Sequence, residues 1–220
     1  MTKLISLDVW NTLLSSQPAY AEARDRLFER EFDLPLAQVK AIYRDHKDGA
    51  DRAAEAFGEG LSSEEVYRKF HAALGLGSDY AWQRLRQGME DAFEAYPPLM
   101  PDVTVNALHE AVERGYRLSI ASNTNFIRGA ILLRAVERAI DRSAFEFTLF
   151  SDEIGFSKPH EQVWNLLKFE ARDRGIMPHE IIHVGDNPVC DGACTAHGLP
   201  HAFTANPTET ASVIHRIISA

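Results

Sequence analysis

The stretch KLISLDV, residues 3–9, is the part of the sequence that decides the fold. It is a short apolar run that carries a carboxylate, Asp8, near its end, a pattern typical of a buried strand. Similar runs follow at 116–121, 146–150 and 181–184, with a weaker one at 200–204. Helical patterns lie between or after the later runs, at about 104–114, 126–140, 160–174, 189–197 and 207–219. Strands that alternate with helices predict an α/β fold with a parallel sheet covered on both faces.

Residues 16–96 show no convincing strand pattern and interrupt this alternation. Helix-like stretches occur there near 18–31, 36–57, 62–74 and 79–94, separated by prolines and glycines. Ser62 or Ser63 is a candidate N-cap for the third stretch, supported by Glu65. The PPLMP segment at 97–101 then returns the chain to the α/β part. We therefore expect a core of residues 1–15 and 97–220 and an inserted all-helical domain of residues 16–96.

Composition narrows the classes of function. The chain has 220 residues, of which 45% are hydrophobic and 25% charged, with a formal net charge of -9. This balance is ordinary for a soluble globular protein, and such an acidic chain repels nucleic acid and anionic membranes. No apolar stretch has the length of a transmembrane helix, and the N-terminus is not a signal peptide. We expect a cytoplasmic protein with a small-molecule partner, and no nucleic-acid or membrane partner.

The two cysteines, Cys190 and Cys194, lie four residues apart. This spacing is not a Cys-x-x-Cys redox motif, and no second pair is present to complete a zinc site. We expect both cysteines to serve as small packing residues. His183 is also expected to be a packing residue.

Polar residues follow each predicted strand. Ligands of parallel α/β sheets bind outside the carboxyl ends of the strands, so these residues mark the candidate site. Asp8 and Thr12 follow the first strand, and the cluster Ser122-Asn123-Thr124-Asn125 follows the second. The third is followed by SDEIGFSKP, which holds Lys158, and the fourth by GDNPVCD, which holds Asp186 and Asp191.

This set of side chains has a chemical logic. Carboxylates that lie close together repel each other unless a cation lies between them, and Mg²⁺ prefers such oxygen ligands. A lysine and a serine hydroxyl can hold an anion such as phosphate. A carboxylate can attack phosphorus to form an aspartyl phosphate, and the cation neutralises the opposing charges.

Four segments in this order, LDVWNTL, IASNT, GFSKP and HVGDNPVCD, resemble the four motifs of the haloacid dehalogenase-like hydrolases. The helical insertion directly after the first motif resembles the cap of the first type in that family. The resemblance covers nearly the whole chain. It implies a Rossmann-like core, a helical cap over the active site, hydrolase activity and Mg²⁺ as the cofactor.

The resemblance also implies a role for each matching residue. Asp8 matches the nucleophile, which is also a metal ligand, and Lys158 matches the catalytic lysine that pairs with both nucleophile and phosphate. Asp186 matches a metal-binding carboxylate, and Asp191 a second one that acts directly or through water. The backbone carbonyl of Trp10 matches a further metal ligand of the family.

The remaining matches lie on the substrate side. Ser122 matches the hydroxyl that binds the transferring group, and its neighbour Asn123 is grouped with it. Thr12 matches the residue that steadies the first loop, and we place it in the same substrate-binding group.

The sequence departs from the family pattern at Trp10. Most phosphatases of this family carry a second aspartate here, which protonates the leaving group, whereas an indole only donates a weak hydrogen bond. We expect the Trp10 side chain to point into the cap-side pocket in its place. The next residue, Asn11, replaces a glycine, and asparagine tolerates left-handed backbone angles better than most residues.

Three functions follow from this departure. The first is a phosphatase or phosphotransferase that uses a better leaving group or takes its acid from the cap. The second is a 2-haloacid dehalogenase, since such enzymes carry an aromatic residue at this position; Arg44 is the candidate for the cap arginine they need. The third is a binding protein that has lost turnover. Asp186 and Asp191 favour the first, because both make sense only with Mg²⁺ present.

Overall fold

The computed structural model describes residues 2–75 and 81–220. Its centre is a five-stranded sheet in the order β3-β2-β1-β4-β5, and all neighbouring strands pair in parallel. The strands are β1 (Leu4–Leu7), β2 (Arg117–Ser122), β3 (Phe145–Phe150), β4 (Ile181–Gly185) and β5 (His201–Phe203). The α/β fold expected from the apolar runs is therefore confirmed.

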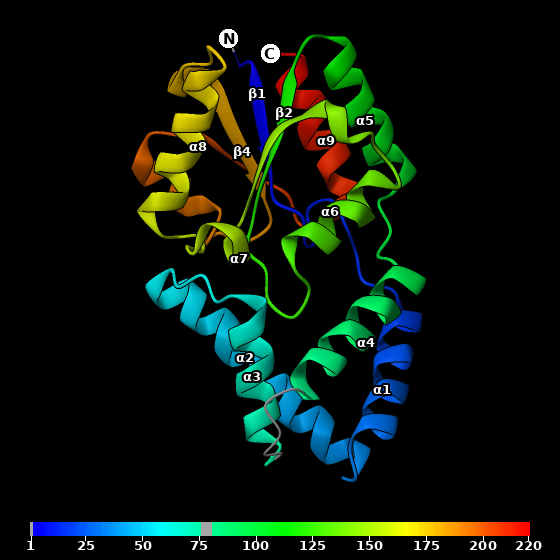
Figure 1. Cartoon of the computed structure of the whole chain (residues 1–220). Coiled ribbons are helices and arrows are strands. Elements are labelled where there is room, and N and C mark those ends of the chain that lie inside the picture. Colours follow the sequence, from blue (N-terminus) through cyan, green and yellow to red (C-terminus); the bar gives the residue numbers. More distant parts are fainter. Residues whose placement is uncertain (1, 76–80) are drawn as a thin grey trace.

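Helices cover both faces of the sheet (Figure 1). They are α5 (Asp102–Glu113), α6 (Gly129–Glu137), the short α7 (Ser151–Ile154), α8 (Glu161–Asp173) and α9 (Pro207–Ile218). The two faces of β1 serve different layers, because successive side chains of a strand point in opposite directions. Ile5 and Leu7 pack with the layer of α5, α6 and α9, whereas Leu4 packs with that of α8.

One predicted helix is wrong. Residues 189–197 do not form an α-helix; a 3-10 helix spans Gly192–His197. The Cys194 amide donates to the Asp191 carbonyl, three residues back, and Gly198 ends the turn with a φ of 78°. The Asp191 side chain is held inside the site described below, which ties down the start of this segment. Two further 3-10 helices span Arg142–Ala144 and Pro178–Glu180.

Residues 16–96 are helical where the structure describes them. The helices are α1 (Pro18–Glu31), α2 (Leu36–Phe57), α3 (Ser63–Ala73) and α4 (Ala81–Ala95), together called the helical unit below. Residues 79 and 80, the start of the fourth predicted helix, lie outside the described residues. Ser62 caps α3 in a capping box with Glu65, one of the two arrangements expected.

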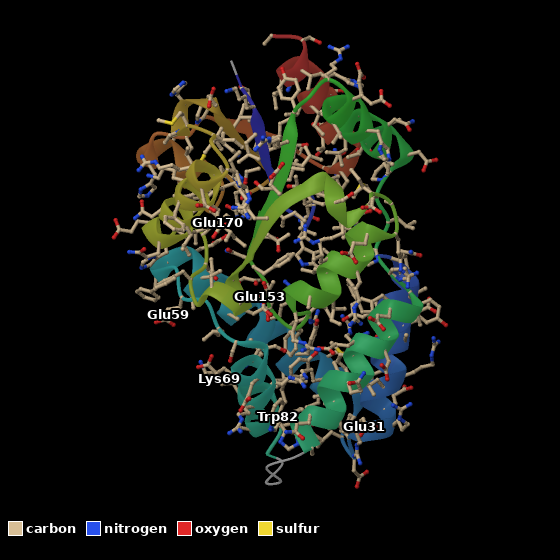
Figure 2. The ribbon with its side chains drawn as sticks, turned by 45° about the horizontal axis from the view of Figure 1, so that its top comes forward. Glu31, Glu59, Lys69, Trp82, Glu153 and Glu170 are labelled. Atoms are coloured by element: carbon tan, nitrogen blue, oxygen red, sulfur yellow. The ribbon has the colours of Figure 1, made fainter. Side chains whose placement is uncertain are left out.

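The helical unit has its own apolar core. Buried side chains from all four helices form it, among them Phe28, Val39, Phe70 and Met89. Phe126, from the loop after β2, completes this core, so the unit packs directly on the α/β part. Figure 1 shows the unit beyond the ends of the strands, and Figure 2 labels Glu31 and Trp82 at its remote end.

The two connections between the helical unit and the sheet lie side by side. Ser15 and Leu99 exchange backbone hydrogen bonds of 3.1 Å in both directions. These residues adjoin the expected boundaries at 15/16 and 96/97, and the division into core and cap stays a prediction. Across residues 2–75 and 81–220, no helix is long and apolar enough to span a bilayer.

Candidate active site

Asp8 lies at the carboxyl end of the central strand. Its amide donates to the Val184 carbonyl of β4 at 2.9 Å, which holds the residue between two strands. The residue is only 6% exposed, and Oδ1 accepts hydrogen bonds from Ser122 Oγ at 3.0 Å and Lys158 Nζ at 2.8 Å. Two of the predicted partners thus meet the predicted nucleophile directly.

Lys158 is buried, and its ammonium group is fully engaged. Nζ donates to Asp8 Oδ1, to Asp191 Oδ1 at 2.5 Å and to the Ala121 carbonyl at 2.8 Å. Three acceptors match the three protons of an ammonium group. The two carboxylates raise the pKa of Lys158 despite its burial, so this residue stays charged.

Asn123 positions Lys158 through its backbone. The amide side chain donates to the Lys158 carbonyl at 2.9 Å and accepts from the Lys158 amide at 2.7 Å. Asn123 also lines the cavity described below, but both of its polar atoms are already used. Asn123 therefore fixes the loop that carries Lys158.

Three carboxylates form a cluster next to this lysine. Asp8, Asp186 and Asp191, here called the acidic cluster, each offer an oxygen, and these oxygens lie within 4.8 Å of one another. Burial raises the pKa of Asp8 to about 6, with Asp191 adding to the rise and Lys158 opposing it. Burial and Asp191 also raise the pKa of Asp186. A nearby cation stabilises the ionised form of both carboxyl groups, so these oxygen ligands fit a hard divalent ion.

Asp191 is the innermost carboxylate. Its Oδ1 accepts from Lys158 and pairs with His183 Nε2 at 2.9 Å, and its Oδ2 accepts from the Asn187 amide at 2.9 Å. Although burial opposes ionisation, Lys158 and His183 hold the pKa of Asp191 well below its usual range. Gly185 makes room for it, since a Cβ at Gly185 would lie 2.2 Å from Asp191 Cγ.

His183 forms a hydrogen bond with Asp191. It is fully buried and packs edge-to-face on Trp164 with ring centroids 5.1 Å apart, as expected of a packing residue. The sequence did not indicate its polar contacts, which join Asp191 to Ser6 Oγ at 3.1 Å. Burial lowers the pKa of His183 to about 4, so the neutral ring donates to Asp191 and accepts from Ser6.

A cavity of about 620 Å³ lies between the acidic cluster and the helical unit. Core residues and residues of α1 and α2 line it together, among them Trp10, Tyr20, Arg44, Asp51, Glu55 and Cys190. A small molecule fits this space with one end at Asp8. A second pocket, lined by Arg24, Lys40 and Tyr43, lies on the helical unit and shares Arg24 and Tyr43 with this cavity.

Trp10 lines the cavity and also packs at the junction of the two parts. Its ring meets Phe93 of α4 edge-to-face, with centroids 6.0 Å apart. Asn11 has a φ of 55°, a left-handed backbone angle of the kind that asparagine tolerates. Asn11 also lies near Asp186 and opposes the rise in the pKa of that carboxyl.

Thr12 does not line the cavity, although we grouped it with the substrate-binding residues. Its side chain is fully buried, and its hydroxyl has no hydrogen-bond partner among the described residues. Its carbonyl accepts from Thr210 Oγ1 at 2.6 Å, which ties the first loop to α9. This placement fits the loop-steadying role rather than substrate contact.

The cysteines differ from each other. Cys194 is a packing residue, as expected: it lies in the core beside α8, and its thiol donates to the Leu199 carbonyl at 3.3 Å. Cys190 is also buried but borders the cavity, 3.8 Å from Asn123 Nδ2.

Known proteins resemble this chain along almost its full length. The sequence model of haloacid dehalogenase-like hydrolases matches residues 2–193. Haloacid dehalogenase-like hydrolase domain-containing protein 3 of Xenopus laevis is 26% identical over 217 residues, which cover 93% of this chain and 84% of that protein.

Two solved structures share the fold. YfnB from Bacillus subtilis, solved with magnesium bound, has a TM-score of 0.73 and 20% identity, covering 100% of this chain and 99% of its own. The 2-haloacid dehalogenase from Pseudomonas syringae has a TM-score of 0.66 and 19% identity, covering 99% and 100%. Together with the match to the family model, these findings show that the chain belongs to the haloacid dehalogenase-like hydrolases.

Proposed function

We propose that this protein is a Mg²⁺-dependent phosphatase or phosphotransferase that acts on a small phosphorylated metabolite through an aspartyl phosphate on Asp8. The observation that carries the proposal is the acidic cluster, with oxygens of Asp8, Asp186 and Asp191 within 4.8 Å of one another at the floor of a cavity. Such a cluster is costly unless a cation neutralises it.

The metal would be held by Asp8, Asp186 and the Trp10 carbonyl. Asp191 already uses both oxygens on protein donors, so it fits contact through water. A bound Mg²⁺ supplies the positive charge that lets a carboxylate approach a phosphate dianion. YfnB, which has the same fold, was solved with magnesium bound.

The chain's own residues prepare the nucleophile. Lys158 and Ser122 both donate to Asp8 Oδ1, which leaves Oδ2 free to attack phosphorus. The Lys158 ammonium group places its positive charge beside Asp8, and Asn123 fixes the lysine loop. The helical unit, residues 16–96, acts as the cap that closes the cavity and selects the substrate.

A 2-haloacid dehalogenase is the alternative that the comparisons bring forward, because solved dehalogenases share the fold. At 18–19% identity this likeness concerns the fold alone. Arg44 lines the cavity, as an arginine that binds a carboxylate would. Displacement of halide needs no cation, however, so a dehalogenase function does not explain why three carboxylates lie together here.

One experiment separates the alternatives. Phosphate release is measured over a panel of phosphorylated metabolites with Mg²⁺ and with a chelator, beside halide release from 2-haloacids. We expect Mg²⁺-dependent phosphate release that disappears in Asp8→Asn. Halide release that is indifferent to the chelator would assign the protein to the dehalogenases, and no release in either assay would support a binding protein.

A further inference from the structure

The proposed reaction needs a proton donor that the core does not supply. An alkoxide leaving group must take up a proton as its bond to phosphorus breaks. Asp8 is the nucleophile in this scheme, Asp186 and Asp191 serve the cation, and the Trp10 indole is too weak an acid. Cys190 also faces the cavity, but burial raises the pKa of its thiol to about 12. The donor therefore has to come from the helical unit.

Four carboxylates of the helical unit line the cavity: Asp48, Asp51, Glu55 and Glu59. Asp51 uses both oxygens, one on Lys47 at 2.6 Å and one on Asn125 at 2.8 Å. Asp48 and Glu59 are exposed, whereas Glu55 is half-buried. Figure 2 labels Glu59 at the margin between the two parts. Glu55 is thus the carboxyl that is both sheltered and incompletely used.

A contact with the metal-side loop aims Glu55 at the site. Asn187, next to Asp186, donates from Nδ2 to Glu55 Oε1 at 2.8 Å. The orientation of this amide is set by its other end, because Asn187 Oδ1 accepts from the amides of Val189 at 2.8 Å and Cys190 at 3.0 Å. Nδ2 must therefore point to Glu55, and Oε2 stays available to carry a proton.

The end of α2 that carries Glu55 is fixed on the core. The Ser157 amide donates to the Gly58 carbonyl at 2.9 Å, and Gly60 approaches the core so closely that a Cβ there would lie 2.5 Å from Phe156 N. Helix stability does not explain the residue, since the last turn of a helix disfavours negative charge. Glu55, Asp8 and Cys190 line the same cavity.

We propose that Glu55 of α2 is the general acid and base of this enzyme, in place of the residue that Trp10 replaces. The inference rests on the proposed function. Asp8 Oδ2 attacks phosphorus, the bond from phosphorus to the leaving oxygen breaks, and that oxygen takes its electron pair and the Glu55 proton. Glu55 then accepts a proton from the water that attacks the aspartyl phosphate. The bond between phosphorus and Asp8 breaks, its electron pair returns to Asp8, and inorganic phosphate leaves.

The test is the dependence on the leaving group in Glu55→Gln. Glutamine keeps the size and the acceptor for Asn187 but carries no transferable proton. With an alkyl phosphate such as glycerol phosphate, whose leaving group needs a proton, we expect a loss of about 10²–10⁴-fold in kcat. With 4-nitrophenyl phosphate, whose leaving group does not, we expect a much smaller loss in the burst of nitrophenol. The phosphoenzyme should then accumulate and be visible in the intact mass of the protein.

Glu29→Gln is the matched control, since it makes the same change in the helical unit, at an exposed position of α1 that does not line the cavity. It should retain both activities. Calorimetric titration with Mg²⁺ should give the same affinity for Glu55→Gln and for the unaltered protein, which shows that the acidic cluster is intact. Should Glu55→Gln fail to fold by circular dichroism, Glu55→Asp keeps a carboxyl on a shorter chain and should lose less on the alkyl phosphate than Glu55→Ala.

Equal losses on both substrates, or none on either, would overturn the role of Glu55 and leave the proposed function standing. Absence of Mg²⁺-dependent phosphate release from the unaltered protein would overturn the proposed function itself. The two failures are therefore distinguishable within one set of assays.

Discussion

Replacement of Asp8 by asparagine is expected to stabilise the metal-free protein while removing its activity. Burial and the neighbouring carboxylates raise the pKa of Asp8 from 3.8 to about 6 in the folded state. Because the folded-state pKa lies above the unfolded value, stability that is present below 3.8 is lost as the pH rises through about 6. Each pKa unit corresponds to about 1.4 kcal/mol, so the ionised carboxylate costs the fold about 3 kcal/mol at most.

Asparagine resembles the protonated carboxyl. Its Oδ1 can still accept from Ser122 and Lys158, as Asp8 Oδ1 does at 3.0 and 2.8 Å, and its amide group can face the carboxylate of Asp186. We expect Asp8→Asn to raise the free energy of unfolding by about 1–3 kcal/mol at about pH 8 in a chelator. The gain should shrink towards about pH 5, where more of Asp8 is protonated.

Urea denaturation followed by tryptophan fluorescence measures this difference at both pH values. Saturating Mg²⁺ should reverse the order of stability, because a ligand at a thousand-fold excess over its Kd adds about 4.1 kcal/mol to the protein that binds it. An Asp8→Asn variant that is less stable than the unaltered protein at about pH 8 in a chelator would refute the reasoning. It would mean that the attraction of Lys158 outweighs the burial of the carboxylate.

Three further outcomes are expected. Mg²⁺ affinity, measured by calorimetry, should fall as the pH drops below about 6, because protons compete with the metal for Asp8; an affinity that stays constant down to about pH 5 would exclude Asp8 as a ligand. Trp10→Asp should raise Mg²⁺-dependent hydrolysis of an aryl phosphate by about ten-fold or more, since it adds an acid at the cavity; an unchanged rate in a folded variant would show that the position is not equivalent to an acid–base residue. Glu90→Gln should cost about 1–3 kcal/mol of unfolding free energy, because Glu90 is buried and accepts two bonds of 2.6 and 2.7 Å from the partly exposed Arg128. Glu94→Gln, in a more exposed pair on the same helix, should cost less than about 1 kcal/mol in the same denaturation assay; equal costs would remove the argument from burial.

The sheet could be predicted because most of its strands correspond to clear apolar runs in the sequence. Central strands of a parallel sheet are buried on both faces and therefore read as near-continuous apolar runs. Every residue of β1, from Leu4 to Leu7, is buried, and so is β2 from Leu118 onward. The weak pattern at 200–204 belongs to β5, a short strand at one edge of the sheet, whose three residues are at least partly exposed.

Asp8, Lys158, Asp186 and Asp191 could also be predicted to lie together, because each follows a strand and parallel strands end at one edge. The left-handed backbone at Asn11 agrees with the tolerance of asparagine for such angles. The 3-10 helix at Gly192–His197 did not, because its start is tied down by Asp191, whose partners include Lys158, 33 residues away in sequence.

Contacts between distant segments were decided only by the tertiary structure. Glu55 and Asn187 are 132 residues apart, and no local pattern in either segment indicates that they meet. The same holds for Phe126, which completes the apolar core of the helical unit from a loop of the α/β part. Periodicity reports which face of an element is buried, but not which element buries it. The composition of the cavity, and with it the choice of a proton donor, therefore emerges only when α2 is packed against the strand ends.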